Sequence, residues 1–144
     1  AFIIYENNED NGLNFGNLYN WYSVADPKGL CPAGWRVPSD ADWENLESTL
    51  GGANVAGGKL KAISELWTSP NSGATNESGF SALPGGKCSS AAVFDSLGFY
   101  GSFWSSTPYE TKTAWTRGIG NSGSRIFRSA QQKASGHAVR CIKN

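Results

Sequence analysis

The chain has no methionine, a single histidine and no acidic residue after Glu110. No apolar run approaches the roughly 18 residues of a membrane helix, so no direct membrane span is expected. No basic segment followed by an apolar one marks a signal peptide. Because the chain starts at Ala1 without methionine, we expect it to be cropped from a longer exported protein.

The three cysteines, Cys31, Cys88 and Cys141, form no CxxC motif and no cluster with the lone His137. A structural zinc site is therefore not expected. A disulfide between Cys31 and Cys141 would tie an early apolar segment to the last one and would suit an exported protein. Cys88 would then remain as a free loop thiol. The alternative is three reduced, buried cysteines in a cytosolic protein.

The charges are unevenly placed although the formal net charge is zero. Residues 1–110 hold five basic and all twelve acidic residues, whereas residues 111–144 hold seven basic residues and no acid. Zero net charge does not indicate a nucleic-acid binder, and no nucleic-acid partner is expected. The basic tail either pairs with the acidic part within one domain or forms a basic face for an anionic or polar ligand.

A length of 144 residues suits one domain with a full core, so we treat residues 1–144 as a single domain. Glu6–Gly12 is expected as a polar turn, and helix-like spacing predicts a short helix over Leu18–Ala25. Ser39 is a strong N-cap, and Asp42 three residues later makes a variant capping box.

The helix after Ser39 is expected to end at a Gly-Gly pair and to carry its acids on a solvated face. Its predicted buried stripe consists of Trp43, Leu46 and Leu50. A second short helix is expected over Ala56–Ile63. Trp67–Gly86 reads as an ordered long loop pinned by spaced apolar anchors. Three of its residues offer oxygen ligands for calcium, the alternative being that they only cap turns: Asn71, Asn76 and Glu77.

Short apolar and alternating segments predict strands. They are Ala1–Tyr5, Gly101–Thr107, Thr113–Gly118, Ser124–Arg128 and His137–Ile142. Polar loops join the last four, which is typical of an antiparallel meander. Alternation directs Ile126 and Arg128 toward the core and leaves Arg125 and Phe127 on the other face.

The same alternation sorts the strand before it. Trp115, Arg117 and Ile119 share one face, and Thr116 and Gly118 share the other. An exposed Phe127 beside Arg125 would form a small aromatic and basic patch of the kind that carries binding energy. The alternative is that Phe127 fills the core. The full set of candidate ligand-binding residues is Tyr109, Lys112, Thr116, Gly118, Asn121, Ser122, Ser124, Arg125, Phe127, Ser129, Ala130, Ala134 and His137.

Five motifs, in order, resemble one known family: CPAGWRVPSDADWENLESTLGG, GGKLK, TNESGFSALPGG, FWSST and GHAVRCIKN. From about Gly16 onward the chain resembles the Fibrobacter succinogenes major paralogous domain, a bacterial exported-domain family. The resemblance implies an α+β, C-type lectin-like fold close to the formylglycine-generating-enzyme branch. In it, two helices pack on a small twisted antiparallel sheet with long ordered loops.

The resemblance also supports the pairing of Cys31 with Cys141, because the family carries cysteine in CPxGW and in the final VRC. Lys87 and Cys88 depart from the residues that usually follow LPGG, so Cys88 has no inherited role.

Variable proteins of diversity-generating retroelements use the same fold branch and vary a C-terminal segment at codons that become NNC. Twelve residues here are reachable by such codons: Thr116, Gly118, Gly120, Ser122, Gly123, Arg125, Phe127, Ser129, Ala130, Ala134, Ser135 and His137. Gln131 and Gln132 are not reachable. The pattern favours a diversified binding surface, which a template repeat beside a reverse-transcriptase gene would test.

We therefore expect a non-catalytic domain, extracellular or on the bacterial cell surface, that binds a protein or glycan ligand without a cofactor. The alternative is a carbohydrate-binding or adhesin module, in which Trp104, Trp115 or Tyr109 would stack on a sugar. The calcium motifs of sugar-binding C-type lectins, of EPN or WND type, are absent. An enzyme is less favoured, because any histidine-based mechanism, including a Cys88–His137 dyad, must use the only histidine.

Overall fold

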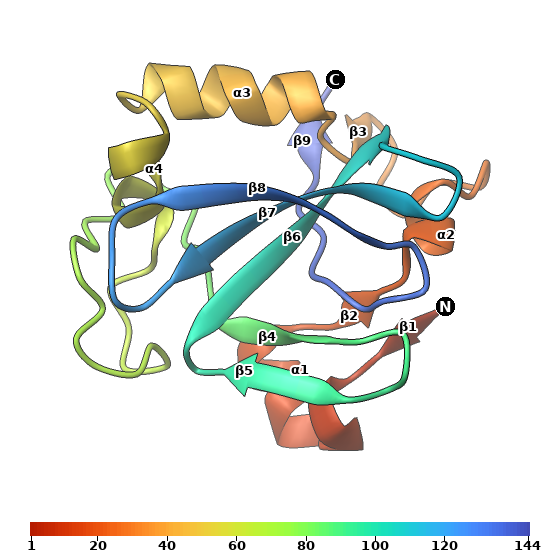
Figure 1. Ribbon diagram of the computed structural model, residues 1–144, viewed down its shortest axis with the longest axis horizontal. Helices are drawn as coiled ribbons and strands as arrows, with labels where there is room; N and C mark the ends of the chain where they lie inside the picture. The colour runs from red at the N-terminus through yellow and green to blue at the C-terminus, as the bar shows by residue number, and fades with distance from the viewer.

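The computed structural model describes residues 1–144 as a mixed α+β domain (Figure 1). Its helices are the 3-10 turn Tyr5–Asn7 followed by α1 (Glu9–Phe15), α2 (Trp21–Val24), α3 (Asp40–Thr49) and α4 (Ala53–Leu60). Its strands are β1 (Phe2–Ile3), β2 (Leu18–Tyr19), β3 (Trp35–Arg36), β4 (Gly85–Cys88), β5 (Phe94–Leu97), β6 (Tyr100–Pro108), β7 (Thr113–Gly120), β8 (Ile126–Gln132) and β9 (Ile142–Lys143). No helix is long and apolar enough to span a bilayer.

The central sheet has five strands in the order β5-β4-β6-β7-β8. Strands β6, β7 and β8 pair antiparallel, which confirms the predicted meander for three of its four segments. The fourth segment, His137–Ile142, instead meets β6 through a parallel bridge between Ala138 and Phe103. Strand β4 joins β6 in parallel through Gly86 and Gly101, and β8 forms one edge of the sheet (Figure 1). Strands β4 and β5 were not predicted, because β4 begins with two glycines and β5 contains Asp95, and both residue types are depleted in strands.

The two ends of the chain are tied into the domain by short pairings. Strand β1 pairs with β2, and β3 pairs with β9. The Cys31–Cys141 disulfide spans 110 positions of sequence and lies next to the β3–β9 pair, which confirms the predicted bridge. Cys88 is the free cysteine, but it lies buried in β4 rather than in a loop.

Helices α3 and α4 cover one face of the β6–β8 meander (Figure 1). The main core fills the space between them and includes Trp43, Leu60, Phe103, Ile119 and Ile126. The side chain of Trp43 packs 5.7 Å from the Phe80 ring and 6.1 Å from the Phe103 ring, between ring centroids. Aromatic pairs at these separations add to the free energy of burial.

The predicted start and end of α3 are confirmed. Ser39 accepts from the Asp42 amide, and Asp42 accepts from the Ser39 amide, so the capping box is complete. The helix ends at Thr49 with Leu50 as its C-cap, just before Gly51 and Gly52, which both adopt positive φ. Helix α4 begins three residues earlier than predicted, because Gly52 lets the chain turn directly into it.

Three other local predictions are corrected. Leu18 lies in β2 and only Trp21–Val24 is helical, so Leu18–Ala25 is not one helix. Glu6–Gly12 is not a simple turn, because the Asn8 side chain accepts from the Asp10 amide and starts α1. His137 and Ala138 form isolated bridges, and regular pairing in the last segment is limited to β9.

Candidate ligand-binding surface

The two faces of the meander carry different side chains. Strands β7 and β8 pair without a bulge from Thr113 opposite Gln132 to Ile119 opposite Ile126. Because paired residues share a face, the face under α3 and α4 carries Trp115, Arg117, Ile119, Ile126 and Arg128. We call it the helix-covered face. The opposite, outer face carries Thr116, Gly118, Phe127 and Ser129, so the predicted alternation is confirmed.

A network of ion pairs joins α3 to the helix-covered face. The Arg117 side chain is fully buried (0% exposed), and it donates from Nη1 to Asp40 Oδ1 at 2.7 Å and from Nε to Glu47. Arg128 donates from Nη2 to Asp40 Oδ2 at 2.7 Å. Burial alone would raise the pKa of Asp40, but the hydrogen bonds from Arg128 and Arg117 outweigh it and hold this pKa below its ordinary value.

This network corrects the expectation that the acids of α3 form a solvated face. Asp40 is buried and Glu47 is bonded to a buried guanidinium, so these two carboxylates belong to the interior. Part of the basic tail therefore pairs with the acidic part of the chain. The sequence around Arg117 or Asp40 does not predict their ion pair, because the two residues are 77 positions apart.

Arg128 also stacks on Trp115 at the end of the helix-covered face. Its guanidinium carbon lies 3.4 Å from the Trp115 ring centroid, and the Tyr109 ring lies 4.4 Å from the same ring. Tyr109 is 53% exposed, whereas Trp104 is fully buried. Of the three aromatic residues considered for stacking on a sugar, Tyr109 alone presents a largely exposed ring.

The outer face presents a second pair of aromatic rings, each beside a cation. Phe127 is 47% exposed, and the Arg125 guanidinium carbon lies 5.5 Å from its ring centroid. The Tyr100 ring lies across Gly118, where a Cβ would collide with the Tyr100 hydroxyl. Lys87 Nζ lies 6.0 Å from the Tyr100 ring centroid. Cation–aromatic pairs of this geometry are attractive and are common at binding surfaces.

Three predicted ligand-binding residues are buried and belong to no exposed surface. Thr116 donates from its hydroxyl to the Ser129 carbonyl at 3.0 Å, and Gly118 lies beneath Tyr100. His137 is 1% exposed, with its Nδ1 2.8 Å from Ser102 Oγ and its ring edge-on to Trp104. Burial, assisted by the charge of Lys87, lowers the pKa of His137 to about 3, so this imidazole is neutral at physiological pH.

A buried lysine anchors the β7–β8 loop through hydrogen bonds to backbone carbonyls. Lys61 Nζ donates to the carbonyls of Ser72 at 2.7 Å, Gly123 at 2.9 Å and Gly120 at 3.1 Å. Asn121 Nδ2 donates at 3.1 Å to the Thr68 carbonyl. The loop is therefore ordered by contacts with the long loop before β4.

The remaining predicted ligand-binding residues are distributed around these features. Ser122 is exposed at the tip of the β7–β8 loop, and the neighbouring Ser124 carbonyl accepts from the Gly58 amide at 3.0 Å. Lys112 is exposed in the β6–β7 turn. Ser129 and Ala130 are half-buried on β8, one on each face. Arg125, Phe127 and Ser129 thus form the one predicted group that the structure brings together on an accessible surface.

The sequence-based prediction missed four contributors to these surfaces: Lys61, Lys87, Tyr100 and Arg128. Arg128 had been assigned to the core side by alternation, which is correct, but its stacking on Trp115 depends on the register between two strands. Nothing in the local sequence marks the other three.

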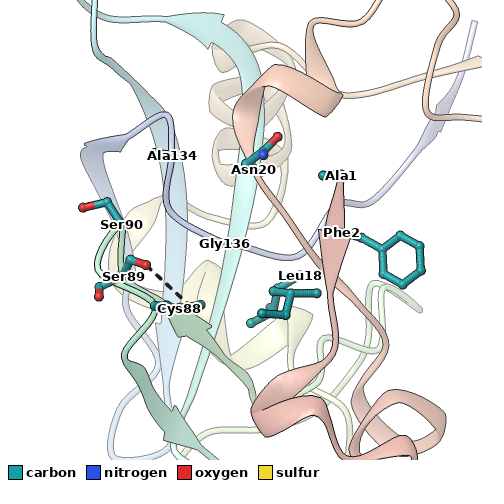
Figure 2. A pocket seen from close by; sticks show the side chains of 11 residues that line it. Ala1, Phe2, Leu18, Asn20, Cys88, Ser89, Ser90, Ala134 and Gly136 are labelled. Atoms are coloured by element: carbon teal, nitrogen blue, oxygen red, sulfur yellow. Dashed lines mark hydrogen bonds between the residues drawn. The ribbon is translucent and has the colours of Figure 1, made fainter.

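A pocket of about 190 Å³ lies beside Cys88, between the β4–β5 turn and the N-terminal strand (Figure 2). Ala134, a predicted ligand-binding residue, lines it together with Leu18 and Gly136. The Cys88 thiol makes its hydrogen bond to the Ser89 carbonyl, with 3.6 Å between sulfur and oxygen, and burial raises its pKa. His137 bonds Ser102 instead, so the two side chains considered as a dyad do not hydrogen-bond each other.

Of the candidate calcium ligands in the long loop, Asn76 and Glu77 have oxygens engaged within the protein, whereas Asn71 Oδ1 is buried without a hydrogen-bond partner. Asn76 Oδ1 accepts from the Ser81 amide at 2.8 Å, and Glu77 pairs with Lys59 at 2.9 Å. Asn71 Nδ2 donates to the Ala62 carbonyl at 3.1 Å. No group of three or more His, Cys, Asp or Glu side chains is arranged to hold a metal ion.

Comparison with known proteins gives one match. No curated protein and no solved structure matches the chain significantly. The sequence model of the Fibrobacter succinogenes major domain matches residues 1–143, which is nearly the whole chain. The chain therefore belongs to the Fibrobacter succinogenes major domain family.

Proposed function

We propose that this protein is a non-catalytic ligand-binding domain whose working surface is the outer face of β8 with the adjoining β7–β8 loop. The observation that carries the proposal is the Arg125–Phe127 pair, an exposed aromatic ring on β8 beside the guanidinium of the residue that precedes the strand. Arginine and large aromatic residues are the types that most often dominate binding energy.

The surface is rigid before any ligand arrives. Phe127 lies opposite Gly118, one pair from the end of an unbroken β7–β8 register, and Lys61 anchors the loop that leads into β8. A preordered surface loses little conformational entropy on binding. Arg125 makes only one side-chain hydrogen bond, from Nη1 to Asn54 Oδ1 at 3.3 Å, so its guanidinium retains donors for a ligand.

The Arg125–Phe127 pair is not explained by the needs of the fold. The core lies on the other face, under α3 and α4, and β8 contributes Ile126 to it. An apolar ring with about half of its surface in water gives up part of the free energy that burial would supply. Burial of the ring against a ligand would recover this free energy in the complex.

We further propose that the domain adopts a C-type lectin-like arrangement of the formylglycine-generating-enzyme branch. Two helices against one face of a meander, together with a long ordered loop, support this assignment. The disulfide is compatible with an extracellular or cell-surface location. The ligand we propose is a protein or glycan displayed on another surface, bound without a cofactor.

We also propose that a retroelement diversifies this surface, and the burial of individual residues limits which positions can vary. Of the twelve residues reachable by NNC codons, four are buried: Thr116, Gly118, Ser135 and His137. Random replacement at these positions would damage packing. The diversified set we propose is therefore the exposed group around β8, including Ser122, Arg125 and Phe127.

The proposal is tested by selecting ligands and then changing the surface. The domain is panned against a displayed random peptide library and applied to a glycan array, with and without EDTA. Binders are then titrated against an Arg125→Glu/Phe127→Ala variant. We expect this variant to lose at least about tenfold in affinity, and EDTA to have no effect.

The matched control is Ile63→Ala, which removes an exposed apolar side chain outside the strands. It should bind as the wild type does. Binding that survives the Arg125→Glu/Phe127→Ala change, or the absence of any peptide or glycan binder, would contradict the proposal.

A further inference from the structure

We propose that the open edge of β8 binds an extended acidic peptide segment by strand addition. This inference rests on the proposed function, since it names the ligand class and binding mode of the same surface. Strand addition joins a peptide to an exposed sheet edge through main-chain hydrogen bonds, while side-chain contacts give specificity.

The hydrogen bonds between β7 and β8 show which backbone groups are free. The Lys133 amide donates to the Lys112 carbonyl at 2.8 Å, which marks this pair as hydrogen-bonded. Such pairs alternate along antiparallel strands. Ser129 and Gln131 therefore direct their backbone groups toward β7, whereas Arg128 and Ala130 direct theirs away from the sheet.

No turn, loop or cap of the chain takes up these outward groups. Neither Arg128 nor Ala130 contributes a backbone amide or carbonyl to any hydrogen bond outside regular strand pairing. Helix α4 covers only the start of the strand, where Gly57 packs against the Arg125 carbonyl. β8 also contains no proline and no bulge, two devices that commonly protect an edge.

The positive charges at the two ends of this edge favour an acidic ligand. Arg125 stands at one end, and Lys112 and Lys133 stand at the other, separated by about 27 Å of extended chain. Arg128, between them, is compensated by Asp40 and by the nearby Glu44 and Glu47, so the ends carry the uncompensated charge. A peptide with acidic residues at both ends matches this pattern.

The same charges disfavour a second copy of the chain at this edge. Pairing two β8 strands would bring like charges of both copies close together, which destabilises cross-strand pairs. Phe127 adds an apolar contact on the outer face for the part of the added strand near Arg125. The observations thus favour an acidic, extended peptide with an apolar side chain near the Arg125 end over self-association.

The test uses a labelled synthetic peptide of about nine residues, with alternating valine and threonine flanked at both ends by aspartate. We expect saturable binding that weakens with salt and slows hydrogen exchange at the Arg128 and Ala130 amides. Ala130→Pro removes an outward amide, which an edge strand tolerates, and should weaken binding at least about tenfold. Ala130→Ser keeps the amide and should bind as the wild type does.

A second arm leaves the protein unchanged. Two peptides are N-methylated at alternate amides, one at the odd and one at the even positions. In one of the two, methylation removes the donors that strand addition needs, and this peptide should bind as weakly as the Ala130→Pro variant does. If Ala130→Pro does not fold, this arm decides alone. No binding at millimolar peptide, equal binding by every variant and peptide, or a dimer that protects Arg128 and Ala130 in the absence of peptide would overturn the inference.

The two proposals fail in distinguishable ways. If selected ligands depend on Arg125 and Phe127 but not on the Ala130 amide, strand addition is wrong and the proposed surface stands. If the peptide depends on the Ala130 amide but not on Arg125 or Phe127, the edge binds peptides and the proposed outer-face surface is wrong.

Discussion

Arginines from one short segment are buried and ion-paired on one face of the β6–β8 meander and exposed on the other. On the helix-covered face, Arg117 is fully enclosed and bonded to Asp40 and Glu47. On the outer face, Arg125 is exposed, has a single long hydrogen bond and lies beside an exposed Phe127. The uneven charge of the sequence is therefore both an internal pairing and an accessible basic surface.

The comparison shows that position in the strand alternation decides what a charged residue does. Arg117 faces α3 and bonds the carboxylates of Asp40 and Glu47. Arg125 lies beside α4, which contributes only the Asn54 amide oxygen as an acceptor. Removing one partner from a buried ion pair leaves an uncompensated charge, whereas removing an exposed cation changes stability little. Substitutions on the two faces should therefore separate stability from binding.

The largest effect is expected for Arg117→Ala. This change leaves Glu47 without its bonded cation and opens a void beneath α3, so it should lower the free energy of unfolding by about 3–5 kcal/mol. Urea denaturation measures the loss. Arg128→Ala is the control on the same face, because its partly exposed side chain should cost about 1 kcal/mol. Equal effects of the two changes would contradict the account.

The next effect is expected for Lys61→Met, which removes the cation behind the β7–β8 loop. Three carbonyls lose their donor, so the free energy of unfolding should fall by about 2–3 kcal/mol and exchange of the loop amides should accelerate. Lys59→Met, two residues earlier in α4, is the matched control, since Lys59 pairs with Glu77 at the surface. If both variants behave alike, Lys61 does not organise the loop.

A pH-dependent effect, absent at pH 7 and growing as pH falls, is expected from His137. Its folded-state pKa, about 3, lies below the value of about 6.5 expected in the unfolded chain. The unfolded state therefore binds the proton first as pH falls, so stability is full above about pH 6.5 and declines toward pH 3 by up to about 1.4 kcal/mol per pH unit. Urea denaturation between pH 7 and 4 should show this slope.

His137→Phe should flatten the slope over that range, because no group at this position then titrates. Asp40 acts at lower pH, since its depressed pKa removes stability only below its ordinary value near 4. A variant that retains the wild-type slope between pH 6.5 and 5 would show that His137 is not its source.

The smallest effect on stability is expected on the outer face. Phe127→Ala and Arg125→Glu remove exposed groups, so each should change the free energy of unfolding by no more than about 0.5 kcal/mol. Thermal denaturation is a sufficient measurement. A loss of several kcal/mol for Phe127→Ala would mean that the ring is part of the core after all.

Local features account for what the sequence predicts well. The Ser39 capping box lies within four residues and specifies where α3 begins without help from the rest of the chain. The placement of Phe127 and Ile126 on opposite faces needs only the alternation of a strand. These predictions are confirmed because each depends on neighbours in sequence.

What the sequence does not show depends on register and distant partners. The sequence predicts Asp40 on the solvated face of α3, and only the packing of α3 against β7 reveals it as the partner of Arg117. Tyr100 reaches the outer face because Gly118, on the next strand, leaves room for its ring. His137 seemed available for binding, yet the crossing of its segment over β6 buries it against Trp104.

The most direct test of the division between the two faces is to measure stability and ligand affinity together in the Arg125→Glu/Phe127→Ala variant. We predict an unfolding free energy within about 1 kcal/mol of wild type and an affinity for selected ligands reduced at least about tenfold. Unchanged affinity, or unfolding that accounts for the lost binding, would contradict the assignment of the outer face of β8 as the ligand-binding surface.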